Sequence, residues 1–198
     1  MEKTAPNCTQ TLPEGYREIL SVDLQQDKKL AFLINGAAVA AMLVLSEVGH
    51  LIMPLSVLVD SSLGLGPYLL RLGVLLAGLA AYIVLHELTH AAVMKAYGAK
   101  KLRFGYTGMY AYAGSLEDYF GKRAYRHIAL APLVLWAVIF GVLCALVPRD
   151  WFWVIWILQI MNVAGAAGDV YVTLRFLRLP GDILVNDTGT SMTVYSAE

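Results

Sequence analysis

The chain has 198 residues, of which 58% are hydrophobic and 15% are charged, against about 45–50% apolar and about 25% charged in soluble domains. A chain this short cannot hide that apolar excess in one core, so the composition predicts contact with lipid and excludes a soluble globular enzyme. The 15 basic and 15 acidic residues balance, and no basic stripe with stacking aromatics indicates a nucleic-acid partner.

Four apolar runs are each long enough for the roughly 20 residues that a membrane-spanning helix needs. We place these helices at 30–58, 67–97, 128–147 and 151–178. The segment before them has no apolar run of the kind found in cleaved signal peptides. The resulting domain organisation is an N-terminal segment (1–29), a four-helix transmembrane domain (30–178) with an insert (98–127), and a C-terminal tail (179–198).

The basic residues flanking the runs predict the orientation. They lie before the first run, between the second and third runs, and after the fourth run, whereas the opposite connections contain only Arg71 and Arg149. By the positive-inside rule, both termini and the 98–127 insert are cytoplasmic. We therefore expect a multi-pass protein of the cell membrane with four spans.

The 98–127 insert shows a strand pattern. Leu102, Phe104 and Tyr106 alternate with Lys101, Arg103 and Gly105, and residues 107–108 can turn before 109–112 return. A β-hairpin over 101–112 is one interpretation, and a tyrosine-rich loop at the membrane surface is the other. The tail has a similar pattern, with 183–185 and 192–195 flanking 187–189. The predicted fold class is an all-α polytopic membrane protein with a short cytoplasmic β-hairpin insert.

The second run ends in the motif HExxH, formed by His86, Glu87 and His90. On a helix, two histidines four residues apart project from one face and can chelate one metal ion, while the glutamate can deprotonate a water on that metal. Ionisable residues at membrane depth are costly and indicate function. A structural role for these residues between packed helices is the alternative.

A catalytic zinc site needs a third protein ligand. His86 and Asp169 each lie nine residues before a basic residue at the cytoplasmic end of a span, or about 13 Å away at 1.5 Å per residue. This matching depth favours Asp169. Glu47 and His50 lie near the outer end of the first helix, and Glu117 and Asp118 lie in the insert, where they are the second choice.

Asn162 lies seven residues before Asp169, which on a continuous helix puts both on one face. The Gly and Ala residues between them allow another helix to approach closely. Asn162 is therefore a candidate for supporting the site, and ordinary helix packing is the alternative explanation for the small residues.

These elements resemble a known group of enzymes. HELTH in one span, a Gly- and Tyr-rich insert, an Ala-Leu-Ala-Pro132 entry to the next span and an Asn-then-Asp element in the last are similar to the three-helix core of site-2 proteases. From Leu12-Pro13-Glu14-Gly15-Tyr16 to Val194-Tyr195, the chain is similar to an uncharacterised bacterial family of membrane zincin peptidases. The site-2 acidic element has a proline after the asparagine and a glycine after the aspartate, but Gly165 and Val170 stand here.

The resemblance implies Zn²⁺ held by His86, His90 and Asp169, with Glu87 as general base. The predicted function is an intramembrane zinc metalloprotease that cleaves membrane-protein or peptide substrates, with the 101–112 hairpin holding a substrate segment as an added strand. Two alternatives remain: a zinc-binding membrane protein without hydrolytic activity, and a zincin that acts at the membrane surface through Glu117. The sequence does not indicate an oligomeric state.

Overall fold

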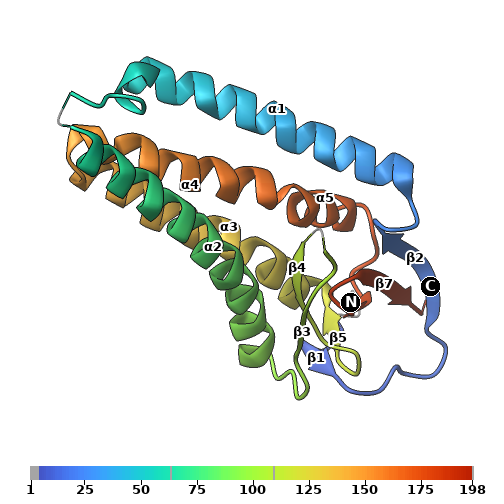
Figure 1. The fold of residues 1–198 in the computed structure, drawn as a ribbon. Helices are drawn as coiled ribbons and strands as arrows, with labels where there is room; N and C mark the ends of the chain where they lie inside the picture. The colour runs from blue at the N-terminus through green and yellow to red at the C-terminus, as the bar shows by residue number, and fades with distance from the viewer. Residues whose placement is uncertain (1–4, 63, 109, 198) are drawn as a thin grey trace. The chain divides into compact units, whose positions relative to one another are not determined.

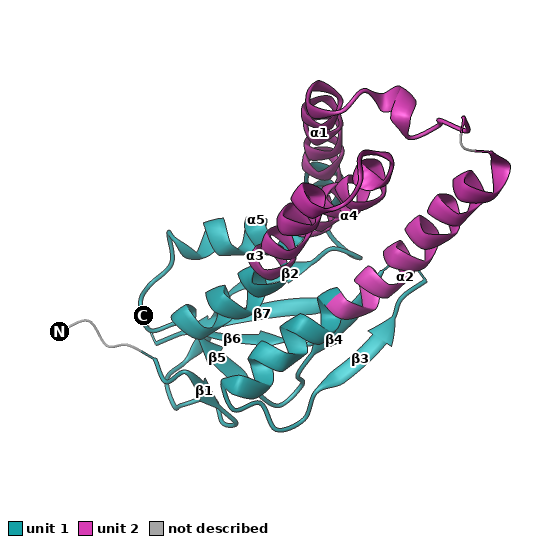
Figure 2. Cartoon of the chain, turned by 90° about the vertical axis from the view of Figure 1, so that its left-hand side faces the viewer, with its two compact units in different colours: residues 1–34, 86–132, 168–198 teal, residues 35–85, 133–167 magenta. Residues whose placement is uncertain are grey.

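The computed structural model describes residues 5–62, 64–108 and 110–197. It divides into two compact units, each built from segments that are distant in the sequence (Figure 2). The first unit contains residues 1–34, 86–132 and 168–198, and the second contains residues 35–85 and 133–167. Several helices therefore begin in one unit and end in the other.

Long apolar helices account for most of the chain (Figure 1). Four helical stretches, of 25, 32, 25 and 28 residues, are long and apolar enough to cross a membrane, which confirms the prediction of four such helices. The elements are α1 (Lys28–Ile52), the 3₁₀ turn η1 (Leu55–Val57), α2 (Leu65–Ala96), α3 (Lys122–Leu146), the 3₁₀ turn η2 (Arg149–Trp151), α4 (Phe152–Gly165) and α5 (Ala167–Phe176).

The helix boundaries differ most from the predicted ones in three places. The first helix ends at Ile52 and not at residue 58, since Pro54 cannot continue it. The third helix begins at Lys122, six residues before its predicted start, because a basic helical segment precedes the apolar run from which that start was predicted. The fourth predicted helix, over 151–178, is present as a helical stretch over Arg149–Phe176 but is interrupted at Ala166, after Gly165, a residue that weakens helices.

The fold is mostly helical, as predicted, but it has more β-structure than the predicted hairpin insert, because a five-stranded antiparallel sheet joins the N-terminal segment, the insert and the tail. Its order is β1 (Cys8–Thr9), β5 (Tyr119–Gly121), β6 (Leu184–Asp187), β7 (Ser191–Ser196) and β2 (Arg17–Asp23). The longest pairing joins β2 to β7, from Arg17 opposite Ser196 to Asp23 opposite Ser191. The two ends of the chain are therefore parts of one sheet.

The insert forms the predicted hairpin. Strands β3 (Arg103–Tyr106) and β4 (Ala111–Gly114) pair in antiparallel register, with Arg103 opposite Gly114. Met109, which we expected in the returning strand, lies outside the described residues. The tail forms the second predicted hairpin, β6–β7, whose turn contains Gly189 at φ +86°, a conformation that favours glycine.

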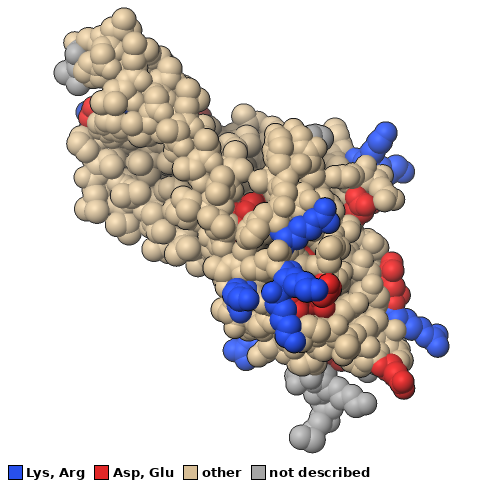
Figure 3. All heavy atoms as spheres, turned by 60° about the horizontal axis from the view of Figure 1, so that its bottom comes forward, with Lys and Arg blue, Asp and Glu red and all other residues tan. Residues whose placement is uncertain are grey.

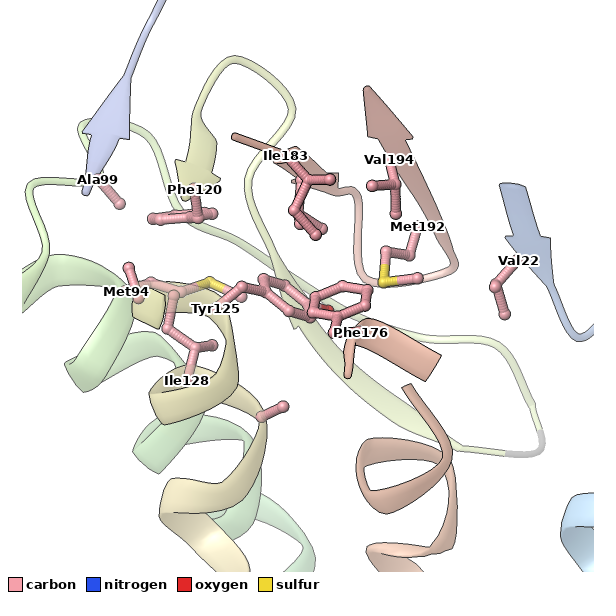
Figure 4. Close-up of a cluster of buried hydrophobic side chains, with 13 residues drawn as sticks. Val22, Met94, Ala99, Phe120, Tyr125, Ile128, Phe176, Ile183, Met192 and Val194 are labelled. Carbon is pink, nitrogen blue, oxygen red and sulfur yellow. The ribbon is translucent and has the colours of Figure 1, made fainter. Parts of the chain in front are cut away.

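The first unit has its own hydrophobic core, in which one face of the sheet packs on helix ends (Figure 4). Phe120, Val185 and Val194 from the sheet and Phe176 from α5 are completely buried, and Tyr125 of α3 packs on Phe176 with ring centroids 5.5 Å apart. Burying each large apolar side chain stabilises the fold by about 1.5–3 kcal/mol. This core fixes the end of α2, the start of α3 and the end of α5 against the sheet.

The second unit is built differently. Its core consists of Tyr82, Phe140 and Leu158, and Tyr82 meets the Trp136 ring edge to face at 6.1 Å between centroids. Many of its large apolar residues are exposed, among them Leu43, Leu76 and Val138. Exposed apolar surface on helices of this length is typical of contact with lipid. Charged side chains gather on one part of the face in Figure 3, and the rest of that face is almost uncharged.

Candidate metal centre

Three side chains of the first unit converge on one point. His86 and His90 are buried on one face of α2, and their Nε2 atoms are 3.2 Å apart. Asp169 lies in the first turn of α5, and its Oδ2 atom is 3.6 Å from each of these nitrogens. Of the groups that sequence analysis singled out, the structure brings these three together.

The orientation of His90 is set by α3. Its Nδ1 atom lies 2.9 Å from the backbone carbonyl oxygen of Ile128. A carbonyl oxygen only accepts hydrogen bonds, so Nδ1 carries a hydrogen and Nε2 is the ring nitrogen that can bind a metal beside Asp169. A backbone carbonyl that accepts a hydrogen bond from the other imidazole nitrogen is common at metal-binding histidines.

The donor set fits a divalent transition metal. Imidazole nitrogens and a carboxylate oxygen are zinc ligands, and bond lengths of 2.0–2.1 Å in a tetrahedron separate neighbouring ligand atoms by about 3.3 Å. The separations of 3.2, 3.6 and 3.6 Å are close to this value. Within residues 5–62, 64–108 and 110–197, these three residues are the group with metal-ligand character whose ligand atoms lie within 4.8 Å of one another.

Glu87 lies next to this group and outside it. Its half-buried carboxylate interacts electrostatically with both histidines and with Asp169. The backbone of Ala113 in β4 lies close to the same carboxylate. The Glu87 carboxylate is therefore next to the three ligand atoms and near a strand of the insert.

The insert's own acids have other partners. Glu117 is exposed and forms an ion pair with Lys101 at 2.9 Å. Asp118 is completely buried and accepts hydrogen bonds from Ser115 at 2.6 Å, from Gln10 at 3.0 Å and from the backbone N–H of Lys100 at 3.0 Å. Hydrogen bonds of this kind fix a carboxylate as part of the fold.

The remaining candidates belong to the second unit. Glu47 and His50 are exposed near the end of α1, and His50 Nδ1 accepts a hydrogen bond from the Leu55 backbone. Asn162 is buried, accepts a hydrogen bond from the Tyr82 hydroxyl at 2.9 Å and donates one to the Leu133 carbonyl at 3.1 Å. The break at Ala166 removes the continuous helix on which its shared face with Asp169 was predicted.

Two polar residues beside the site were missed from the sequence. The Tyr125 hydroxyl in α3 donates a hydrogen bond to the Asp187 carboxylate at the end of β6. Asp187 interacts electrostatically with His90 and Asp169, and burial raises the pKa of its carboxyl above the usual value. Aspartate is common in turns, and Asp187 is followed by Thr and Gly. The local sequence therefore explains Asp187 as a turn residue and does not indicate a nearby site.

Comparison with known proteins identifies relatives of the sequence. Over 115 residues, 56% of this chain, it is 32% identical to the "Uncharacterized 24.7 kDa protein in gap 5'region" of Pyrococcus woesei, and it covers 49% of that relative's length. No solved structure matches the fold. The family model described as "Putative zincin peptidase" matches residues 79–184, more than half of the chain and all three residues of the candidate metal centre. The chain therefore belongs to this family of zincin peptidases.

Proposed function

We propose that the protein is an intramembrane zinc metalloprotease, with zinc held by His86, His90 and Asp169. The observation that carries the proposal is the convergence of these three ligand atoms at separations suited to tetrahedral zinc. All three belong to helical stretches apolar enough to cross a membrane. Family membership supports a zinc metallopeptidase, and the membrane-capable helices support a substrate that is itself a membrane protein or a membrane-associated peptide.

Each residue has a defined task in this proposal. When bound, zinc supplies Lewis acidity that polarises a peptide carbonyl and lowers the pKa of water. Glu87 accepts the water's proton and passes it to the leaving amine. The Ile128 carbonyl keeps the His90 ring turned toward the ligand cluster. A helical substrate must unwind before cleavage, and the β3–β4 hairpin offers an edge for an added strand.

The orientation in the membrane is part of the proposal. Both chain termini would lie in the cytoplasm of a cell-membrane protein, because the basic residues that flank the spans favour that side. A three-helix arrangement like that of site-2 proteases is supported by α2, α3 and α5, which supply the ligands and the carbonyl that orients His90.

The test separates catalysis from simple metal binding. The purified full-length chain in detergent micelles and its Glu87→Gln variant are compared for zinc content by mass spectrometry, and the membrane proteomes of cells producing each are compared for cleaved peptides. We expect equal zinc content, and cleavage products only with the wild-type chain. Glu117→Gln, at an exposed glutamate of the insert, is the matched control and should behave as wild type.

Two other results would redirect the proposal. Equal zinc content with identical proteomes would indicate a zinc-binding protein without hydrolytic activity. Loss of zinc in Glu87→Gln would indicate that this glutamate is a ligand, which contradicts its assignment as general base.

A further inference from the structure

The second unit contains a groove between α1, the segment that follows it, and α4. Its volume is about 560 Å³, within the roughly 300–1,000 Å³ of small-molecule sites. The residues that line it all belong to the second unit. Its walls include Leu43, Ser46, Glu47 and His50 of α1 and Trp153 and Ile157 of α4.

Two tryptophans of α4 hold α1 beside it. The indole N–H of Trp156 donates a hydrogen bond to the Leu45 carbonyl oxygen at 2.9 Å. The indole N–H of Trp153 donates one to the Pro54 carbonyl oxygen at 3.2 Å. Gly49 allows this close approach, because a Cβ there would be 2.2 Å from the Trp156 indole nitrogen. The groove is therefore a fixed feature of the packing of these two helices.

One end of the groove is polar. Glu47 and His50 are three residues apart, so they share one face of α1. Among residues 5–62, 64–108 and 110–197, none of the ion pairs includes Glu47. His50 Nδ1 accepts a hydrogen bond from the Leu55 backbone N–H at 3.1 Å, so the ring hydrogen is on Nε2, which is a donor. The groove therefore offers a charged acceptor and a hydrogen-bond donor one helical turn apart.

The rest of the groove is apolar, and its polar end lies toward the end of α1. Glu47 is five residues before Ile52, the last helical residue, or about 8 Å at 1.5 Å per residue, whereas Leu43 is about 14 Å from it. α1 is apolar enough to cross a membrane, and lipid headgroups lie where such a helix ends. The groove thus matches a molecule with its apolar part in the bilayer and its polar part at the surface.

The charge of Glu47 discriminates between the classes of membrane lipid. Charged side chains on membrane-spanning helices are costly and are almost always paired, so this carboxylate favours a cationic group and repels an anionic headgroup. A quaternary ammonium has no N–H to donate. A primary ammonium donates strong, charge-assisted hydrogen bonds to a carboxylate. A phosphate joined to that ammonium can accept a hydrogen bond from His50 Nε2.

We propose that the groove binds a phospholipid with a primary-ammonium headgroup, of the phosphatidylethanolamine class. The ammonium donates to Glu47, the phosphate accepts from His50, and the acyl chains lie along Leu43 and Ile157. The inference does not depend on the proposed function, because the groove is built from residues of the second unit alone.

Native mass spectrometry of the full-length chain in detergent micelles tests the lipid class. Dioleoyl phosphatidylethanolamine, phosphatidylcholine and phosphatidylglycerol are titrated separately. We expect one bound phosphatidylethanolamine per chain, with a Kd about 10-fold below that of the other two, because a hydrogen bond between charged groups contributes about this factor. Equal affinity for the three lipids would overturn the proposal. Glycerophosphoethanolamine, which has the headgroup without acyl chains, should not bind, and binding as tight as that of the lipid would contradict the assignment to a lipid.

Variants of Glu47 test the charge. Glu47→Gln should raise the Kd for phosphatidylethanolamine about 10-fold, to that of phosphatidylcholine, because the charged acceptor is lost. Glu47→Lys should reverse the preference in favour of phosphatidylglycerol. Glu117→Gln, at an exposed glutamate of the first unit, is the matched control and should bind lipid as wild type does. An unchanged Kd for phosphatidylethanolamine in Glu47→Gln would contradict the proposal.

A second pair of variants tests the location without changing a charge. Leu43 lines the groove and the neighbouring Val44 lies outside its lining, although their exposed fractions are similar, at 67% and 62%. Leu43→Trp should fill the groove and weaken the binding of phosphatidylethanolamine, whereas Val44→Trp should leave it unchanged. If both variants bind the lipid as tightly as wild type, the lipid lies elsewhere on the chain and the groove is not its site.

Discussion

The two units contain parts of the same apolar helices and differ in what their polar residues do. Thirteen of the 15 Lys and Arg residues and 12 of the 15 Asp and Glu residues fall within the sequence ranges of the first unit. In the second unit, Arg71 is buried and donates hydrogen bonds to the carbonyl oxygens of Asp60 and Asp150, and Asn162 binds Tyr82 and Leu133. In the first unit, two imidazoles and a carboxylate point at one another.

The difference shows how to interpret polar residues in apolar helices. Burial alone does not distinguish a site from a structural hydrogen bond, because Asn162 and His86 are both buried. The distinction lies in direction: Asn162 is paired with the Tyr82 hydroxyl, whereas His86, His90 and Asp169 each turn a possible ligand atom toward the other two, within 4.8 Å of one another. Converging acceptors repel one another until a cation or proton joins them.

The largest effect should follow from replacing Asp169, the acidic residue of the fourth apolar segment. We expect Asp169→Ala to lose most bound zinc and all cleavage, because two histidines remain as ligands. Asn162→Ala, its matched variant in the second unit, should retain zinc. Metal content of the purified proteins is measured by mass spectrometry after dialysis against a weak chelator.

Glu117→Ala provides the other control. Glu117 is exposed and paired with Lys101, so its loss should leave zinc content unchanged. If Asp169→Ala retained bound zinc and Glu117→Ala lost it, Asp169 would not be a ligand. That result would favour a zincin that acts at the membrane surface.

The second prediction concerns the side of the membrane on which one exposed position of each unit lies, and it is tested by labelling single cysteines. In a background with Cys8 and Cys144 replaced by serine, an impermeant thiol reagent added to intact cells should react with Ser61→Cys. It should leave Gln26→Cys unlabelled, because the basic flanks predict that this segment is cytoplasmic. Both positions are exposed, and labelling both after lysis controls for reactivity. Reaction of Gln26→Cys in intact cells would reverse the orientation.

Much of the candidate site could be predicted from the sequence, because its signals are local or periodic. The HExxH spacing alone puts His86 and His90 on one helical face, and counting 1.5 Å per residue from basic anchors selected Asp169, which the structure puts 3.6 Å from both. Alternation of apolar and polar residues over 101–106 indicated a hairpin at 101–112, and the structure has one at 103–114.

The five-stranded sheet could not be predicted in the same way. β1 has two residues, and its partner β5 lies more than 100 positions later in the sequence, so no local pattern indicates the pairing. The Ala113 amide beside Glu87 depends on the backbone of β4, which side-chain identity does not encode. Asp187 and Tyr125 meet because the sheet folds the tail onto α3.

A smaller effect is expected on stability in the second unit. Tyr82→Phe removes the hydroxyl that donates to Asn162 and leaves a buried amide oxygen without that partner. This should lower the free energy of unfolding by about 1–3 kcal/mol. Tyr82→Phe should therefore unfold at a lower temperature in micelles and keep its zinc, since its hydrogen bond belongs to the other unit. Loss of zinc in this variant would mean that the second unit contributes directly to the site.

The smallest effect concerns the pH dependence of the sheet in the first unit. Burial alone raises the pKa of Asp118, but hydrogen bonds from Ser115, from Gln10 and from the backbone amides of Lys100 and Lys101 lower it below its ordinary value of 3.8. A carboxyl with a lowered folded-state pKa stabilises the fold above its unfolded-state pKa, and this contribution disappears as the pH falls through the folded-state value.

The expected result is a difference in slope below about pH 4, where the unfolded chain binds the proton more readily than the folded one. Wild-type protein should lose stability as the pH falls through this range, whereas Asp118→Asn should start less stable at neutral pH and lose less. Glu117→Gln, at the exposed neighbouring acid, should follow the wild-type curve. Thermal unfolding in micelles between pH 7 and pH 3 gives the three curves. If Asp118→Asn and wild type share one slope, the hydrogen bonds to Asp118 do not favour its charged form, and the insert depends on the packing of its apolar residues instead.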